Sequence, residues 1–299
     1  MFCILCIGLL IRRAHIVPDD VFHHLSTISF RVLLPFLLFY NLYSANLSSA
    51  VNPKLLLFLF VWIIVWFCLC YFCCTRFISD PRRRGAVVQA SFRSNIAVIG
   101  VSLAINMMSS DGLAMLAVAI SMLTICFNVL SVITLERCRG GSVDLSHTLR
   151  SIVRNPLIIG CVIGFLFLLL NIRLPEPLER AAGNVGTAGS VCTMLALGAS
   201  FEFNGLRRNA KVLIGCNLLR LVISPLISIS LAVILGFRGD ALGTILICVG
   251  APLATVSYPM ALVYDSDHEL TAQIVVTTSI VCTFTLFLWI FCLKQLGLI

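Results

Sequence analysis

Charged residues are scarce in this sequence: Asp, Glu, Lys and Arg together make up 11% of its 299 residues, while 60% are apolar. An average soluble domain is about a quarter charged, so this composition excludes an ordinary soluble globular fold. It also excludes intrinsic disorder, which needs much charge and few apolar side chains. Ten membrane-spanning helices of about 20 residues each would use about 200 residues, which leaves no room for a separate soluble domain. We therefore expect an all-α polytopic membrane protein.

The chain also lacks the patterns of several functional classes. It has no glycine-rich ATP-binding loop and no helical pair of histidines, so we expect no cofactor and no metal. The 14 cysteines lie almost entirely in apolar runs, where they act as apolar fillers. The net charge of +8 is spread over small clusters, which argues against a nucleic-acid partner. A presenilin-like protease would need Tyr-Asp before Gly-x-Gly-Asp, but here Asp240 precedes Tyr264-Asp265, so we expect no enzyme.

Apolar runs long enough to span a bilayer follow one another along the chain. The predicted spans are residues 20–45, 53–74, 85–106, 111–135, 151–171, 176–201, 210–235, 240–263 and 269–293. A further apolar run at residues 2–11 rises only about 15 Å, half the hydrocarbon thickness. We interpret it as a first helix that lacks its outer half, which makes ten.

Basic residues are unevenly divided between the two sets of loops. One set holds 13 of them, against five in the other. The larger set is Arg12, Arg13, Arg76, Arg82, Arg83, Arg84, Arg137, Arg139, Arg150, Arg154, Arg207, Arg208 and Lys211, and the smaller set is Lys54, Arg173, Arg180, Arg238 and Lys294. Because loops rich in Lys and Arg stay in the cytoplasm, we expect a plasma (inner) membrane protein with both termini outside.

Division at Gly140-Gly141 gives two five-helix repeats, residues 1–140 and 141–299. Since five is odd, the second repeat has the opposite orientation, which is the geometry of inverted-topology transporters. The fourth helix then corresponds to the ninth. Gly160 and Gly164, together with Gly183, Gly186 and Gly189, are predicted to form close-packing faces.

The fourth and ninth helices are both interrupted near their middles. Arg93, Ser94 and Asn95 interrupt the fourth, and Gly250-Ala251-Pro252 interrupts the ninth. Proline removes a backbone donor and clashes with the preceding turn, while Ser and Asn favour helix starts. Two half-helices therefore begin near the bilayer centre, and their amino ends favour an anion. The candidate substrate-binding residues are Arg93, Ser94, Asn95, Gly250, Ala251, Pro252, Thr255, Tyr258 and Arg220.

Each of these features has a plainer interpretation. A single break can be a tolerated kink, and Arg93 or Arg220 can extend its charge to the membrane surface. Polar residues such as Asn41 and Asn128 more often bond across helix contacts than bind ligands. Two breaks in corresponding helices of an inverted repeat favour the functional interpretation.

Four segments resemble the auxin efflux carrier family, which includes plant auxin carriers and bacterial permeases. They are Ser91–Gly100, Arg154–Gly160, Leu195–Ser200 and Gly250–Tyr264. The resemblance implies ten helices in two inverted repeats, a substrate site at the crossing fourth and ninth helices, and elevator-like transport. It implies that Asn95 and Pro252 frame the site. Ser94 stands where plant carriers have proline, which is a departure from their pattern. The resemblance to bacterial members implies malate, malonate and similar carboxylates as substrates.

One function is favoured at this point, and two alternatives remain. The favoured function is a secondary transporter of small organic anions in the lipid bilayer, with protons as a candidate coupling ion and a homodimer as a candidate assembly. The alternatives are an exporter of auxin-like aromatic acids and an anion channel of the same fold. A current that does not saturate would favour the channel.

Overall fold

The structure is a computed structural model that describes residues 1–45, 51–139 and 145–299. Within these ranges every regular element is a helix. Six helices there are long and apolar enough to cross a membrane, and a seventh is added if the pair α8–α9, bent by 59°, counts as one span. The prediction of an all-α polytopic membrane protein is thus confirmed.

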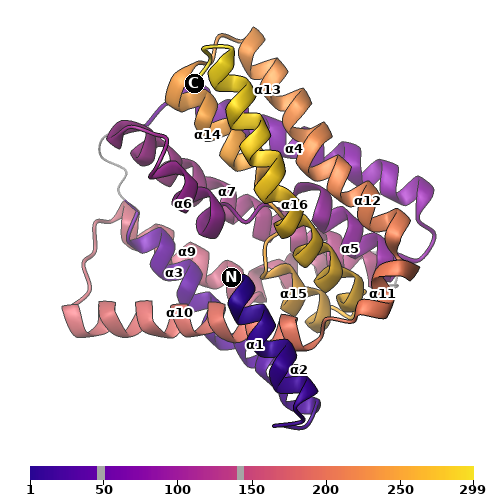
Figure 1. The fold of residues 1–299 in the computed structure, drawn as a ribbon. Coiled ribbons are helices and arrows are strands. Elements are labelled where there is room, and N and C mark those ends of the chain that lie inside the picture. Colours follow the sequence, from indigo (N-terminus) through magenta and orange to yellow (C-terminus); the bar gives the residue numbers. More distant parts are fainter. Residues whose placement is uncertain (46–50, 140–144) are drawn as a thin grey trace.

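The helices follow the predicted apolar runs closely (Figure 1). In chain order they are α1 (Phe2–Arg13), α2 (Asp20–Ile28), α3 (Leu34–Tyr43), α4 (Pro53–Phe77), α5 (Pro81–Phe92), α6 (Val101–Ala104), α7 (Ser110–Cys138), α8 (Leu145–Arg154), α9 (Pro156–Leu169), α10 (Glu176–Ala199), α11 (Phe203–Arg208), α12 (Ala210–Leu218), α13 (Ser224–Ile234), α14 (Gly239–Gly250), α15 (Ser257–Val263) and α16 (His268–Gln295). Three π-helical turns join neighbouring helices: η1 (Ser29–Leu33), η2 (Ile96–Gly100) and η3 (Leu219–Ile223).

Several helix starts have a clear local cause. The side chains of Asn52, Asp80 and Asn155 each accept an amide hydrogen bond where α4, α5 and α9 begin, and proline follows each of them. A side-chain oxygen at this position satisfies an amide that has no partner within the helix, and proline suits the first helical position because its missing amide is not needed there.

Three of the ten expected spans fall short in length or apolarity. Helix α1 has 12 residues, and α10 has 24 residues but contains many glycines and polar side chains. The expected span at 240–263 is divided into α14 and α15, of 12 and seven residues. Length and apolarity therefore identify fewer spans than the apolar runs predicted.

The helices form two groups that alternate along the chain (Figure 1). The scaffold group contains α1, α2, α3, α9 and α10, and the crossing group contains α4 to α7 and α12 to α16. Glycines bring the scaffold helices together, as predicted. A Cβ on Gly160 would lie 2.4 Å from the carbonyl oxygen of Pro35, and one on Gly198, which is not part of the predicted faces, would lie 2.1 Å from that of Leu5. These backbones therefore touch.

Two helices of the crossing group are broken where the sequence predicts interruptions. Helix α5 ends at Phe92, and η2 begins at Ile96; α14 ends at Gly250, and α15 begins at Ser257. At the near end of α5, the carbonyl of Arg82 accepts from the Oγ of Ser266 (2.8 Å), just beyond α15. At the far end of the same broken helix, beyond α6, the hydroxyl of Ser109 bonds to Asp240 at the start of α14. The two broken helices therefore run antiparallel.

Candidate functional site: a cavity at the crossing of two broken helices

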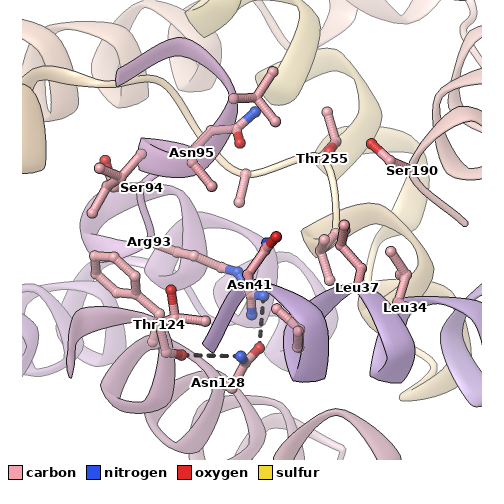
Figure 2. Close-up of a pocket in the computed structure, with 17 residues that line it drawn as sticks. Leu34, Leu37, Asn41, Arg93, Ser94, Asn95, Thr124, Asn128, Ser190 and Thr255 are labelled. Carbon is pink, nitrogen blue, oxygen red and sulfur yellow. Dashed lines mark hydrogen bonds between the residues drawn. The ribbon is translucent and has the colours of Figure 1, made fainter. Parts of the chain in front are cut away.

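A cavity of about 220 Å³ lies where the broken helices cross (Figure 2). Both helix groups line it. The scaffold group contributes Leu34, Leu37, Leu38, Asn41 and Ser190, and the crossing group contributes Arg93, Ser94, Asn95, Ile96, Ala97, Val98, Thr124, Phe127, Asn128, Ala254, Thr255 and Val256. The mixture of apolar walls and a few polar groups is typical of a site for a small molecule.

Arg93 places a positive charge at this cavity. It follows α5 directly, and only 4% of its surface is exposed. Its guanidinium donates from Nη2 to Oδ1 of Asn128 (2.9 Å) and from Nη1 to Oγ of Ser131 (2.8 Å) and Sδ of Met260. All three partners are neutral, and no carboxylate lies within 4.0 Å of Arg93 among the described residues. The charge is buried without a counter-charge.

The start of η2 and the residues just before α15 line the same cavity. They are Ile96, Ala97 and Val98 in η2, and Thr255 and Val256 before α15. The first amides of a helix such as η2 have no partner within that helix and carry a partial positive charge. The first turn of α15 has no free amide, because its amides donate to the carbonyls of Ala254, Thr255 and Val256 and its third residue is a proline. The side-chain nitrogen of Asn95 adds a buried donor with no hydrogen-bond partner. Arg93 therefore lies among further positive groups, and the cavity favours an anion.

Arg220 has the opposite surroundings. It is 2% exposed and donates from Nε to the carbonyl of Ala251 (3.0 Å) and from Nη1 to the carbonyl of Phe92 (3.1 Å). These carbonyls lie at the carboxyl ends of α14 and α5. A helix carries about half a negative charge at this end, so two ends match one guanidinium. Arg220 bonds only to backbone carbonyls, its buried Nη2 has no hydrogen-bond partner, and it does not line the cavity.

The nine predicted substrate-binding residues therefore occupy three places. Arg93, Ser94, Asn95 and Thr255 line the cavity. Gly250, Ala251, Pro252 and Arg220 lie at the crossing itself, outside the cavity lining; the carbonyl of Pro252 accepts from the amide of Asn95 (2.8 Å).

Tyr258 lies elsewhere. Its hydroxyl is 2.5 Å from Oγ of Ser200, in a separate pocket that also contains Arg12, His23 and Glu202. Within the described residues, no group of three or more His, Cys, Asp or Glu side chains is arranged to hold a metal ion.

Sequence reasoning named Asn128 only as a residue that bonds across a helix contact, and it missed Thr124 and Ser131 on the same face of α7. Thr124 and Asn128 line the cavity, and Ser131 bonds to Arg93. Their spacing of four and then three residues places them on one face of a helix. Because this face opposes the Arg93 break, the periodicity would have identified the partners of the arginine.

Comparison with known proteins identifies the family of the chain. The family described as membrane transport protein matches residues 1–290. The chain belongs to this family. It is the auxin efflux carrier family that the four sequence segments resemble. An uncharacterized transporter of Methanothermobacter thermautotrophicus is 23% identical over 285 residues, which are 95% of this chain and 93% of that protein. The chain is thus a multi-pass member of a membrane transporter family.

Proposed function

We propose that this protein is a secondary transporter of small organic anions, carboxylates in particular, and that the cavity at the crossing is its substrate site. One observation carries the proposal: the buried charge of Arg93 has no carboxylate partner among the described residues and borders a cavity. A buried charge is costly unless it is paired, and an arginine at this depth in a span marks a substrate or ion pathway. A carboxylate ligand would supply the missing charge.

The two arginines differ in a way that supports this assignment. Arg220 bonds to the carboxyl ends of α5 and α14, whereas Arg93 adds a positive charge beside the amino end of η2. Partial negative charges oppose the guanidinium of Arg220, although its Nη2 has no hydrogen-bond partner, whereas the surroundings of Arg93 have an excess of positive charge. Arg220 therefore enters the proposal as a positioning residue, which fixes the crossing, and Arg93 as the residue that binds substrate.

We extend the proposal to ten spans in two inverted repeats, residues 1–140 and 141–299. Both α5 and α14 contain 12 residues before their breaks, and the two broken helices run antiparallel, as inversion requires. In this arrangement the ends rich in arginine face the cytoplasm of a plasma membrane, and both termini lie outside.

The mechanism we propose is elevator-like. The cavity lies between the scaffold group and the crossing group, so sliding of one group against the other would carry the substrate across the membrane. The backbone contacts at Gly160 and Gly198 make the scaffold group rigid, and Arg220 ties both breaks of the crossing group to η3. Each group can thus move as a unit.

The test is uptake of radiolabelled malonate and malate into vesicles that contain the purified protein. We expect saturable uptake, which Arg93→Gln abolishes because the positive charge is lost. Arg76→Gln, an exposed arginine at the end of α4, is the matched control and should transport normally. Full transport by Arg93→Gln would contradict the proposed site, and a current that does not saturate would indicate a channel.

A further inference from the structure

A second and larger cavity, of about 860 Å³, opens at the arginine-rich end of the molecule. Elements of both groups line it: η1, the end of α7, α8, the start of α9 and the end of α15. Its lining residues are Phe30, Arg31, Glu136, Arg139, Arg150, Ser151, Arg154, Asn155, Pro156, Val263 and Tyr264. We call this cavity the arginine vestibule.

Positive charge dominates the lining of the vestibule. Among the described residues, the lining holds four arginines from three separate elements and one carboxylate, Glu136, which already accepts a hydrogen bond from the hydroxyl of Ser151. The side chains of Arg31, Arg139, Arg150 and Arg154 are exposed. A cleft lined by one sign of charge, with apolar walls, concentrates the field and raises the local concentration of counter-ions. The vestibule therefore attracts anions from solution.

The vestibule lies on the same helices as the Arg93 cavity. The segment α2–η1–α3 contributes Arg31 to the vestibule and Leu34 and Asn41 to the cavity. Ten helical residues rise about 15 Å, so Arg31 and Asn41 are about that far apart along this segment. Helix α7 likewise contributes Asn128 to the cavity and Glu136 to the vestibule. The two spaces therefore lie at successive heights along the same helices, and we call the path between them the groove.

An apolar cluster reaches from one space to the other: Phe30 and Tyr264 line the vestibule, and Leu34 lines the cavity. It contains Phe30, Leu34, Leu38, Leu42, Val132, Leu135, Leu157, Ile158, Cys161, Met260 and Tyr264, all buried. At its outer edge, Nδ2 of Asn155 donates to the hydroxyl of Tyr264 (2.9 Å), which links α9 of the scaffold group to the end of α15 in the crossing group. At its inner edge, Met260 contacts the guanidinium of Arg93. The cluster therefore extends from the vestibule to the Arg93 cavity.

We infer that the arginine vestibule is a second anion site, which holds a carboxylate-bearing solute on the arginine-rich side before the apolar cluster opens and the solute reaches Arg93. This inference rests on the proposed function, because it concerns the same solute and the same groove. The vestibule site and the cavity differ in how strongly salt screens their charges. Its arginines are exposed, so salt weakens it, whereas the buried charge of Arg93 is screened much less.

The experiment measures binding of radiolabelled malonate to purified protein in phosphatidylcholine nanodiscs at low and high salt. We expect two classes of site in the unmodified protein. High salt should weaken one class about tenfold, within the range by which focused charge raises local ion concentration, and leave the other nearly unchanged. Arg31→Gln combined with Arg150→Gln should remove the salt-sensitive class alone.

Two comparisons keep this inference separate from the proposed function. Arg76→Gln combined with Arg207→Gln removes the same charge from exposed positions outside the vestibule and should keep both classes. Arg93→Gln should remove the salt-resistant class and keep the other, so failure of the cavity site leaves the vestibule site measurable.

Three results would overturn the inference. The first is a salt-sensitive class that survives unchanged in the Arg31→Gln/Arg150→Gln variant. The second is loss of that class in nanodiscs that contain phosphatidylglycerol, because a lipid headgroup would then be the occupant. The third is the absence of any malonate binding, which would overturn both the inference and malonate as a substrate.

Discussion

The backbone amide of Asn95 donates a hydrogen bond of 2.8 Å to the carbonyl of Pro252, so the interruptions of the two broken helices touch. One break thus satisfies part of the hydrogen-bonding need of the other, which matters because an unpaired backbone group in a membrane costs several kcal/mol. Arg220 satisfies two more of these groups, the carbonyls of Phe92 and Ala251. The crossing is therefore held by its own backbone and one arginine, while Arg93 and the start of η2 border the cavity.

Loss of Arg220 should destabilise the crossing. In Arg220→Gln the carbonyls of Phe92 and Ala251 lose their donors, and each unsatisfied buried group costs about 1–3 kcal/mol. Arg220→Lys should not restore stability, because an ammonium lacks the planar fork that reaches both carbonyls. Thermal unfolding in detergent measures the effect. A lysine variant as stable as the original protein would contradict the role assigned to the fork.

A carboxylate beside Arg93 should compete with the substrate. Asn128→Asp keeps the size of the side chain that bonds to Nη2 of Arg93, but it supplies the counter-charge that the cavity lacks. We expect malonate to stabilise the unmodified protein by about 2.7 kcal/mol at 100 times its dissociation constant, and to have almost no effect on this variant. Thermal unfolding with and without malonate measures the difference.

The matched control for this variant is Asn217→Asp. Asn217 lies on α12, and its side chain donates to the carbonyl of Leu213, outside the cavity. The control introduces the same acid within a span, so it should retain stabilisation by malonate. Equal stabilisation of Asn128→Asp and the original protein would show that Arg93 does not bind the anion.

The sequence predicts the breaks and the glycine faces because both are local properties. Arg93-Ser94-Asn95 and Gly250-Ala251-Pro252 interrupt their own helices, and a stripe of glycines marks a close approach before its partner is known. The partners of Arg220 could not be predicted in this way. Its donors reach carbonyls 31 and 128 residues away along the chain, and backbone carbonyls have no signature in a sequence.

The surroundings of Tyr258 could not be predicted from the sequence either. It follows the second break by a few residues, and on a short half-helix this proximity suggested the substrate site. A rise of 1.5 Å and a turn of about 100° per residue instead carry its side chain to Ser200. The distance of a residue from a break along the sequence thus does not predict which way its side chain points.

Added volume at the glycine contacts should separate scaffold helices. In Gly198→Ala the new Cβ would meet the carbonyl oxygen of Leu5 at 2.1 Å, and backbone atoms cannot move aside cheaply. Overpacking of this kind costs about 1–3 kcal/mol. Gly215→Ala is the control, since nothing lies within 4 Å of its added Cβ. It should be neutral or slightly stabilising because alanine is the better helix former. Equal unfolding temperatures for the two variants would contradict close packing of α1 on α10.

Removal of the link between Tyr264 and Asn155 should open the groove towards the arginine vestibule. Tyr264→Phe keeps the ring in the apolar cluster but removes the hydroxyl that accepts from Asn155. A hydrogen bond of this kind contributes about 0.5–1.5 kcal/mol, so the open population should rise about two- to tenfold. Cys161, a buried thiol within the cluster, reports the opening.

Peptide mass spectrometry after treatment with a water-soluble maleimide measures the labelling rate of Cys161. The rate should rise in Tyr264→Phe by the same factor as the open population, because the thiol reacts only when water enters the cluster. Tyr40→Phe is the matched control. Tyr40 packs against Gly183 within the scaffold group and is not a member of the apolar cluster. Loss of its hydroxyl should therefore leave the labelling rate unchanged. If both variants label Cys161 at the original rate, the bond to Asn155 does not hold the groove closed.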